Sequence, residues 1–264
     1  MKFTKMQGLG NDYVYIDCFS EQVEEPEKLA VRIADRHFGV GGDGLILICP
    51  SDLAPVRMRM YNADGSEGKM CGNGARCVAR YAYDHGLVKT RSFDLETGAG
   101  IRHAEVGETE VAIDMGEARL DGELEETITV NGRKTNMTPV NVGNPHAVYL
   151  VDSLETLRTL DLNAIGPAYE HHPRFPEGVN SEFLYIESPT ELHMRVYERG
   201  SGETLACGTG ATAVAFAAMQ LGRAEKAVTV HLLGGNLKLE QRSNGHFLMT
   251  GPAVEVFSGS YFSE

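Results

Sequence analysis

The chain has 264 residues, which is long for one domain and typical of two, and its 42% apolar content can fill a hydrophobic core in each half. Its formal net charge of −13 argues against binding to nucleic acid or to an anionic membrane surface, because both need basic patches. No segment approaches the ~20 apolar residues of a membrane-spanning helix, and no apolar signal segment follows Met1. The five cysteines fit no zinc-binding spacing, so we expect no metal site and reduced thiols, as in a cytoplasmic protein.

The first half of the chain alternates glycine-rich loops with apolar segments. Loops at residues 8–12 and 39–44 each precede a predicted strand, and residues 27–37 between them have the apolar spacing of a helix. A further strand-like segment at 58–61 leads through another glycine-rich loop to the motif Cys71-Gly72-Asn73-Gly74. Small residues at helical spacing follow, which predicts a buried helix.

The same order of features returns in the second half of the chain. Loops at 143–146 and 178–182 precede predicted strands, and the motif Cys207-Gly208-Thr209-Gly210 precedes a second helix of small residues. Corresponding motifs are separated by 133, 139 and 136 positions. With a shift of 136 positions, 10 of the 24 residues at 59–82 are identical to their counterparts. We therefore interpret the whole chain as an internal duplication.

Alternating apolar and polar residues predict further strands between and after the two cysteine motifs. These segments are residues 91–115, 127–135, 227–232, 236–240 and 246–250, with a last segment at 254–257 that could return to the sheet of the first half. We therefore predict an α+β fold of two pseudo-symmetric domains. The predicted domains are residues 1–116 with 253–264, which contain Cys71, and residues 117–252, which contain Cys207.

Each Cys-Gly-x-Gly motif is predicted to lie where a loop meets the first turn of a helix. Glycine lets a ligand approach the backbone closely, and the free N–H groups of a helix N-terminus bind carboxylates or phosphates. The same positive helix end lowers the pKa of a thiol. We therefore expect Cys71 and Cys207 to face one anion-binding cleft between the halves. Two such thiols suit stereoinversion at a carbon acid, because one removes a proton from one face and the other returns a proton to the opposite face.

Taken together, the motifs resemble those of the diaminopimelate epimerase family. The resemblance covers nearly the full length and rests on Gly8-Leu9-Gly10-Asn11-Asp12, Asn62-Ala63-Asp64-Gly65-Ser66, Cys71-Gly72-Asn73-Gly74-Ala75-Arg76-Cys77, Gly143-Asn144-Pro145-His146, Glu198-Arg199-Gly200-Ser201-Gly202-Glu203-Thr204 and Ala206-Cys207-Gly208-Thr209-Gly210. It implies pyridoxal-independent interconversion of LL- and meso-diaminopimelate, in lysine and peptidoglycan synthesis. It also implies a homodimer in which each domain is a curled mixed sheet around a central helix. No pyridoxal-lysine motif or flavin fingerprint stands out, so we expect no cofactor.

The resemblance also assigns roles to individual residues. Cys71 and Cys207 match the acid/base pair, and His146 and Glu198 match the residues that tune these thiols and hold the reacting amine. The positions that match substrate contacts are Asn11, Asn62, Asn144, Asn180, Glu198 and Arg199, and the positions that match backbone donors at the helix starts are Gly72, Asn73, Gly208 and Thr209. Gly44 departs from several members of the family, which have a glutamine there that touches substrate.

Two other functions remain open from the sequence. A proline or hydroxyproline racemase resembles this chain in fold and paired thiols, but its substrate would leave Asn62, Asn180 and Arg199 without a distal group to bind. A non-catalytic binding module or a cysteine-free isomerase relative is disfavoured because both cysteines are in place. The other cysteines, Cys18, Cys49 and Cys77, are expected to be core thiols, and His171 and His172 are expected to lie on the surface.

Overall fold

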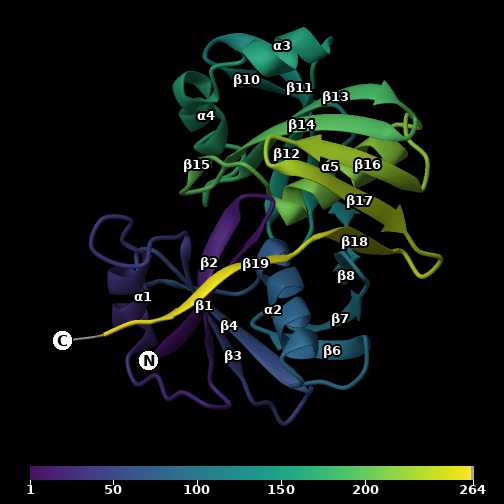
Figure 1. The fold of residues 1–264 in the computed structure, drawn as a ribbon. Helices are drawn as coiled ribbons and strands as arrows, with labels where there is room; N and C mark the ends of the chain where they lie inside the picture. Colours follow the sequence, from purple (N-terminus) through teal and green to yellow (C-terminus); the bar gives the residue numbers. More distant parts are fainter. Residues whose placement is uncertain (263–264) are drawn as a thin grey trace. The chain divides into compact units, whose positions relative to one another are not determined.

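The structure is a computed structural model that describes residues 1–262. The chain folds into two compact units (Figure 1): unit 1 comprises Met1–Asp114 and the C-terminal segment from Thr250, and unit 2 comprises Met115–Met249. The chain passes from one unit to the other within β8 (Glu110–Glu117) and again within β18 (His246–Pro252). Residues 263 and 264, the end of the predicted first domain, lie outside the described residues.

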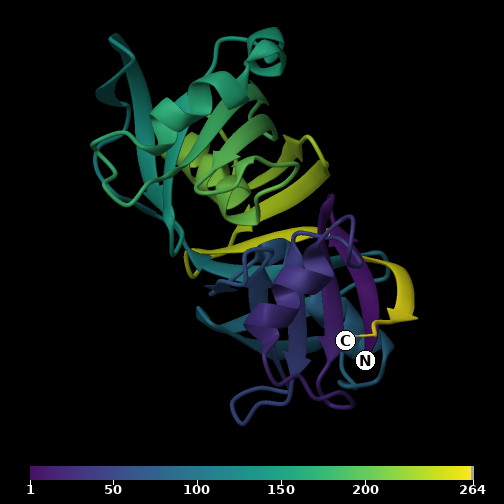
Figure 2. The same ribbon diagram turned by 90° about the vertical axis from the view of Figure 1, so that its left-hand side faces the viewer.

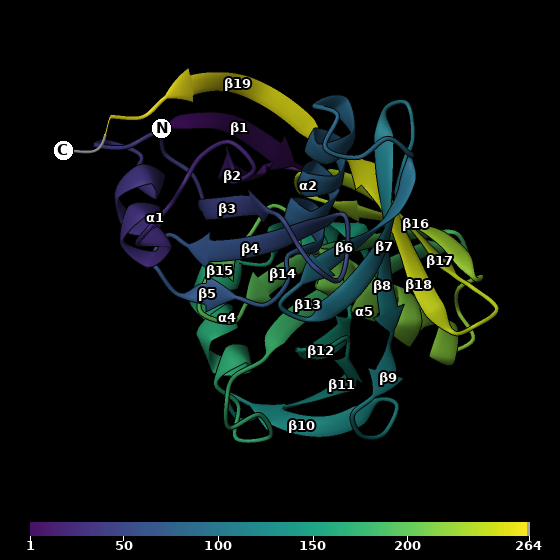
Figure 3. The ribbon, with the colours of Figure 1, turned by 90° about the horizontal axis from the view of Figure 1, so that it is seen from below.

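Unit 1 contains a mixed sheet. Besides β8, its strands are β1 (Lys2–Gly8), β2 (Asn11–Asp17), β3 (Gly44–Cys49), β4 (Val56–Asn62), β5 (Glu67–Gly68), β6 (Ser92–Thr97), β7 (Gly100–Val106) and β19 (Val254–Ser260). β1 pairs antiparallel with both β19 and β2, and β2 pairs in parallel with β3. β4 is antiparallel to β3 and parallel to β6, after which β7 and β8 follow in antiparallel pairs. The last strand therefore returns to the first-half sheet, as predicted, and lies beside β1 (Figure 3).

Helix α2 (Gly72–Asp84) is the buried centre of unit 1 (Figure 1). It contacts strands β1, β2, β3, β4, β7 and β19, so the sheet curls around it. Its Ala75, Ala79 and Ala82 are fully buried, and small side chains let the strands approach the helix closely. Arg76 is also fully buried, and its guanidinium donates to the Pro252 carbonyl at 3.1 Å and to Asn73 Oδ1 at 2.9 Å. Such hydrogen bonds are required because an unpaired buried charge is costly.

Helix α1 (Pro26–Ala34) covers another face of the same sheet, in front of its strands in Figure 2. Its apolar residues Leu29 and Ile33 pack into a core with residues of β2 and β3. The predicted helix at 27–37 is therefore confirmed in type but is shorter than expected. The Asp35 carboxylate accepts hydrogen bonds from the N–H groups of His37 and Phe38 at 2.7 and 2.8 Å, which turns the chain out of the helix.

Unit 2 repeats this plan. Besides β18, its strands are β9 (Arg119–Leu120), β10 (Glu126–Val130), β11 (Arg133–Asn141), β12 (Pro145–Leu150), β13 (Asn180–Ser188), β14 (Glu191–Glu198), β15 (Gly202–Glu203), β16 (Ala227–Leu232) and β17 (Gly235–Gln241). β12–β13 is parallel, β13–β14 antiparallel and β14–β16 parallel, the same senses as β2–β3, β3–β4 and β4–β6. The predicted α+β fold of two related halves is confirmed.

Helix α5 (Gly208–Gln220) is the centre of unit 2 and contacts β11, β12, β13, β14, β16 and β17. A helix that is apolar and small on every side is expected to be buried in this way. Two further helices, α3 (Leu154–Thr159) and α4 (Leu162–Glu170), pack on β13 and β14 and were not predicted. Within residues 1–262, every helix is too short or too polar to cross a bilayer.

Candidate active site

In unit 1, Cys71 is the N-cap of helix α2. Its backbone is extended, and its sulfur accepts a hydrogen bond from the N–H of Gly74 at 3.3 Å. The thiol in turn donates to Asn11 Oδ1 at 3.2 Å, and the Asn11 amide donates to Asp43 Oδ2 at 2.8 Å. The predicted loop-to-helix junction is therefore present, and its thiol lies at the positive end of the helix.

Two asparagines near Cys71 have their side chains engaged within the protein. Asn73 is 2% exposed, and its Oδ1 accepts from Arg76. Asn62 ends β4, and its amide donates to Ser66 Oγ at 2.9 Å, which closes the turn that follows. The backbone N–H groups of Gly72 and Asn73, the first residues of α2, are among the helix-start donors that lack an intrahelical acceptor.

Gly44, the position at which the sequence departs from the family resemblance, begins strand β3. Its φ is +155°, and an added Cβ would lie 2.0 Å from the backbone oxygen of Tyr61. A contact this short cannot be relieved by a side-chain rotation, because the neighbouring atom belongs to the backbone. The backbone of this chain therefore excludes a side chain at position 44.

In unit 2, Cys207 is the N-cap of helix α5 in the same geometry. Its sulfur accepts from the N–H of Gly210 at 3.3 Å and lies 3.5 Å from Thr209 Oγ1. Cys207 is only 5% exposed, and this burial raises the pKa of its thiol well above the ordinary value. The nearby carboxylates of Glu198 and Glu182 raise that pKa further. The expectation that the helix end would lower the thiol pKa is therefore wrong for Cys207, because desolvation outweighs the hydrogen bonds from Thr209 and Gly210.

Glu198 lies at the end of β14, where its carboxylate accepts a hydrogen bond from the Thr204 hydroxyl. Burial raises the pKa of Glu198, and hydrogen bonds with Thr204 and Cys207 partly oppose this rise. The structure thus brings the predicted Glu198 to the Cys207 thiol. Thr204 belongs to the family motif at residues 198–204, although the resemblance assigns it no role. Its hydrogen bond orients the Glu198 carboxylate.

His146 lies on β12 and forms a buried pair with Glu182 on β13. Both side chains are 0% exposed, and His146 Nδ1 lies 2.7 Å from Glu182 Oε1. The other imidazole nitrogen is hydrogen-bonded to Asn144 Oδ1 at 2.9 Å, and the Asn144 amide donates to Thr209 Oγ1 at 3.5 Å. These contacts connect His146 to the start of helix α5.

Sequence reasoning missed Glu182 as a site residue. The signal was a single carboxylate at the end of the 178–182 loop, directly before an apolar segment. His146 is paired with Asn180 in the parallel ladder, so Glu182, two residues further on, faces the same side of the sheet as His146. Its second oxygen, Oε2, is buried without a hydrogen-bond partner, which is unusual for a buried carboxylate.

Asn180 and Arg199 connect two loops of unit 2. The Asn180 amide donates to the Pro145 carbonyl at 3.0 Å, and its Oδ1 accepts from the backbone N–H of Arg199 at 3.0 Å. The Arg199 side chain is exposed, and its Nη1 donates to the Glu177 carbonyl at 3.3 Å. Asn180 therefore has a structural role in holding the Arg199 loop, in addition to the substrate role that the resemblance implies.

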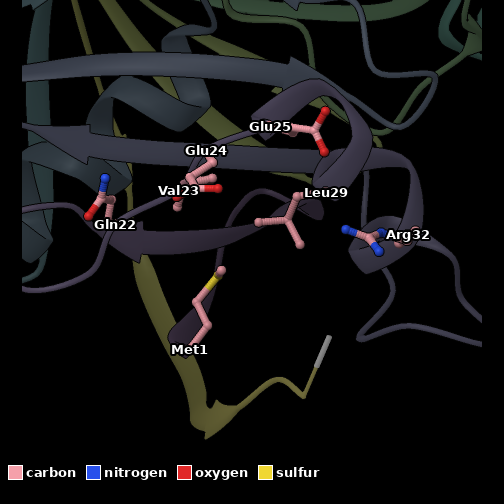
Figure 4. Close-up of a pocket in the computed structure, with 7 residues that line it drawn as sticks. All are labelled: Met1, Gln22, Val23, Glu24, Glu25, Leu29 and Arg32. Atoms are coloured by element: carbon pink, nitrogen blue, oxygen red, sulfur yellow. The ribbon is translucent and has the colours of Figure 1, made fainter. Parts of the chain in front are cut away.

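Each unit therefore holds a thiol at the N-terminus of its central helix, with Asn11 hydrogen-bonded to Cys71 in unit 1 and with Thr209 and Glu198 beside Cys207 in unit 2. That Cys71 and Cys207 face each other across a cleft stays a prediction. Among the residues that the structure describes, no group of three or more His, Cys, Asp or Glu side chains is arranged to hold a metal ion. A separate pocket of ≈ 290 Å³ in unit 1 (Figure 4) is bordered by Met1, Leu29, Arg32 and residues 22–25, and no predicted site residue lines it.

The duplicated α+β fold also occurs in solved proteins named as a proline racemase, a hydroxyproline epimerase and PhzF-family phenazine biosynthesis proteins. Solved structures with this fold include a PhzF-family phenazine biosynthesis protein from Bacillus anthracis, with a TM-score of 0.78 and 17% identity over 100% of this chain and 99% of that chain. A probable proline racemase from Agrobacterium radiobacter has a TM-score of 0.76 and 15% identity, over 100% and 93%. At these identities the likeness shows the fold alone.

The sequence comparisons narrow the class to one family. The family model described as diaminopimelate epimerase matches residues 3–120 and 138–256. The diaminopimelate epimerase of Acetivibrio thermocellus is 48% identical over 276 residues, covering 98% of this chain and 98% of that protein. The Bacillus subtilis protein of the same name is 47% identical over 282 residues, covering 99% and 98%. The chain belongs to the diaminopimelate epimerase family and is an enzyme of the isomerase class.

Proposed function

We propose that this chain interconverts LL- and meso-diaminopimelate, with Cys71 and Cys207 as the two acid/base groups. The observation that carries the proposal is the family membership together with the two cysteine N-caps, which occupy equivalent positions in the duplicated fold. One thiolate removes the α-proton from one face of the carbon, and the opposite thiol delivers a proton to the other face. The reaction belongs to lysine and peptidoglycan precursor synthesis.

The local geometry supports a starting protonation state for Cys207. Because burial and two carboxylates raise its pKa well above the ordinary value, Cys207 holds its proton at neutral pH before substrate binds. This state suits Cys207 to act as the proton donor, and the reaction in that direction needs Cys71 as a thiolate to remove the substrate proton. An incoming ammonium group beside Glu198 would offset the carboxylate charge and make the reverse direction accessible.

The helix starts supply the stabilisation that a carbanion needs. The N–H groups of Gly72 and Asn73 at α2, and of Gly208 and Thr209 at α5, are suited to bind the substrate carboxylate beside the reacting carbon. His146 holds Asn144 next to Thr209. The planar guanidinium of Arg199 is suited to bind a carboxylate at the distal end of the substrate through two hydrogen bonds. Further polar contacts to the substrate would come from Asn11, Asn62 and Asn180. No cofactor or metal takes part, so a chelator should leave the activity unchanged. We also propose that the enzyme acts as a cytoplasmic homodimer, as the family resemblance implies.

Substitution of each thiol tests the assignment directly. Cys71→Ala and Cys207→Ala should each reduce epimerisation by at least the ~10² to 10⁴ of a general acid or base, with a smaller effect on the unfolding midpoint. Activity on LL-diaminopimelate should be followed beside activity on L-proline, which tests the proline racemase alternative. Near wild-type turnover in either variant, or preferential turnover of L-proline, would contradict the proposal.

Isotope incorporation tests whether two bases act on opposite faces. In D₂O, a thiol equilibrated with solvent delivers deuterium, so the first meso product from LL-diaminopimelate should contain deuterium at the inverted centre. Residual substrate should stay largely protiated, because the first thiol returns the hydrogen that it removed. Mass spectrometry at low conversion measures both. Product that is mainly protiated would indicate a single base and would overturn the two-thiol mechanism.

A further inference from the structure

Two cysteines outside the catalytic motifs end neighbouring strands of unit 1. Cys49 is the last residue of β3, and Cys18 follows directly after β2. The two strands are parallel, with Asp17 opposite Ile48, and the N–H of Cys18 donates to the Ile48 carbonyl at 2.9 Å. That hydrogen bond extends the ladder by one residue, so Cys18 and Cys49 are the next residues to lie opposite each other.

The placement of these residues fits the geometry of a disulfide. Paired strands lie ~4.8 Å apart, which is within the ~4.4 to 6.8 Å between Cα atoms that a disulfide requires. The Cys18 thiol donates to the Ile16 carbonyl at 3.9 Å, the Cys18 and Cys49 thiols are close enough to influence each other's ionisation, and both residues pack against the same core of unit 1. No large movement of the backbone is therefore needed to join the two sulfurs.

The two thiols differ in their electrostatic surroundings. The neighbouring Cys18 thiol lowers the pKa of Cys49, and the charges of Arg59 and Arg57 on the neighbouring strand β4 lower it further. The Cys49 thiol raises the pKa of Cys18, together with burial and the charge of Asp17. Both residues are only partly buried, so small molecules in solution can reach them. A thiol of lowered pKa next to a thiol of raised pKa is the arrangement of a nucleophile and a resolving cysteine.

We propose that Cys18 and Cys49 form a redox-active dithiol that low-molecular-weight disulfides convert to an intramolecular disulfide. The Cys49 thiolate attacks one sulfur of glutathione disulfide, and one glutathione leaves as its thiolate. The Cys18 thiol then loses its proton and attacks the Cys49 sulfur, which releases the second glutathione thiolate. The two cysteines are oxidised, and one glutathione disulfide is reduced to two glutathione molecules once their thiolates take up protons.

This pair is separate from the catalytic thiols. Asn11, which is hydrogen-bonded to Cys71, begins β2, whereas Cys18 follows the other end of that strand, ~23 Å away at the rise of an extended chain. The cross-link would close the segment between Cys18 and Cys49, which contains helix α1, without involving either cysteine N-cap. Sequence reasoning treated Cys18 and Cys49 as core thiols; both are in fact half-buried, and only Cys77 of these three is fully buried.

The test uses the full chain with Cys71→Ala and Cys207→Ala, which leaves Cys18, Cys49 and Cys77 as the cysteines. The reduced protein is treated with glutathione disulfide, and free thiols are counted by maleimide labelling and mass spectrometry. We expect two thiols to be lost and a tryptic species that joins residues 6–28 to residues 37–57. Loss of no thiol, a stable glutathione adduct on Cys49 with Cys18 still free, or a linkage that includes Cys77 would overturn the proposal.

Single substitutions separate the two roles. In the same background, Cys18→Ser should accumulate one glutathione on Cys49, whereas Cys49→Ser should remain largely unmodified. Cys77 is the internal control, because burial raises its pKa to about 11. The lowered pKa of Cys49 gives it far more thiolate than Cys77 at pH 7. After allowance for the weaker nucleophilicity of a less basic thiolate, we expect iodoacetamide to alkylate Cys49 at least ~10-fold faster. Equal alkylation rates, or a stable adduct on Cys18 in the Cys49→Ser variant, would show that the nucleophile is misassigned.

Discussion

Replacement of Glu182 by glutamine should lower the pKa of the Cys207 thiol. A methyl group placed on Gly210 would lie 2.9 Å from Glu182 Oε1 and 3.3 Å from Cys207 Sγ, so these two atoms are at most about 6 Å apart. At an effective dielectric constant of about 20, two unit charges at that distance repel by ~3 kcal/mol, which corresponds to ~2 pKa units. We therefore expect the pKa of Cys207 to fall by ~1 to 2 units.

The sign follows from the charge of the carboxylate. A negative charge disfavours the thiolate, so its removal lets Cys207 ionise at lower pH, and the limb of the pH–rate profile that depends on Cys207 should move to lower pH. Glutamine has nearly the shape of glutamate and keeps an acceptor for His146 Nδ1, so the fold around the imidazole should be retained.

The assay is the pH dependence of Cys207 alkylation by iodoacetamide in a Cys71→Ala background, read by peptide mass spectrometry. Glu170→Gln is the matched control, because Glu170 is a buried carboxylate of the same unit that accepts from the N–H of Gly200 and is not among the charges that raise the Cys207 pKa. A shift below ~0.5 unit in Glu182→Gln, or an equal shift in Glu170→Gln, would refute the electrostatic reasoning.

Three further changes have defined outcomes. Arg199→Lys keeps the charge but loses the planar fork, and activity on diaminopimelate should fall by ~10-fold or more in steady-state assays; unchanged activity would exclude bidentate binding of a carboxylate. Gly44→Gln should lower the free energy of unfolding by ~2 kcal/mol or more relative to the control Gly86→Ala. Both glycines have positive φ, but a Cβ at Gly44 would clash with the Tyr61 carbonyl, whereas a Cβ at Gly86 has no atom within 4 Å. Equal urea unfolding midpoints for the two variants would contradict this. Because burial raises the pKa of Cys77 from 9.0 to about 11, the folded protein keeps a proton that the unfolded chain loses above pH 9. The contribution of the protonated Cys77 thiol to the free energy of unfolding is therefore full below pH 9 and is lost as the pH rises toward 11. In urea unfolding with reductant, the wild type should lose ~2.7 kcal/mol more free energy of unfolding over this pH range than Cys77→Ala. The same pH dependence in both proteins would contradict this.

The duplication, the two cysteine N-caps and most of the strands can be predicted from the amino-acid sequence alone. These features depend on local signals: a cysteine followed by glycine and small residues starts a buried helix, and alternating residues make half-buried strands. The segment at 227–232 is strand β16 with the same bounds, and both central helices begin directly after the predicted cysteines. Local sequence was less informative for α3 and α4, which are short and, in α4, contain Pro167.

Which side chains are in contact, and how their pKa values are shifted, depends on the tertiary structure. Glu182 reaches His146 because β12 and β13 pair in parallel in one register, and a shift of one residue would turn Glu182 to the other face. The Cys207 pKa is raised rather than lowered because the surrounding sheet removes water from the thiol and places carboxylates beside it. Cys18 and Cys49 become neighbours only through the β2–β3 ladder. Strand register and desolvation depend on contacts between residues far apart in the chain. Local sequence patterns do not show these contacts, so they cannot predict either property.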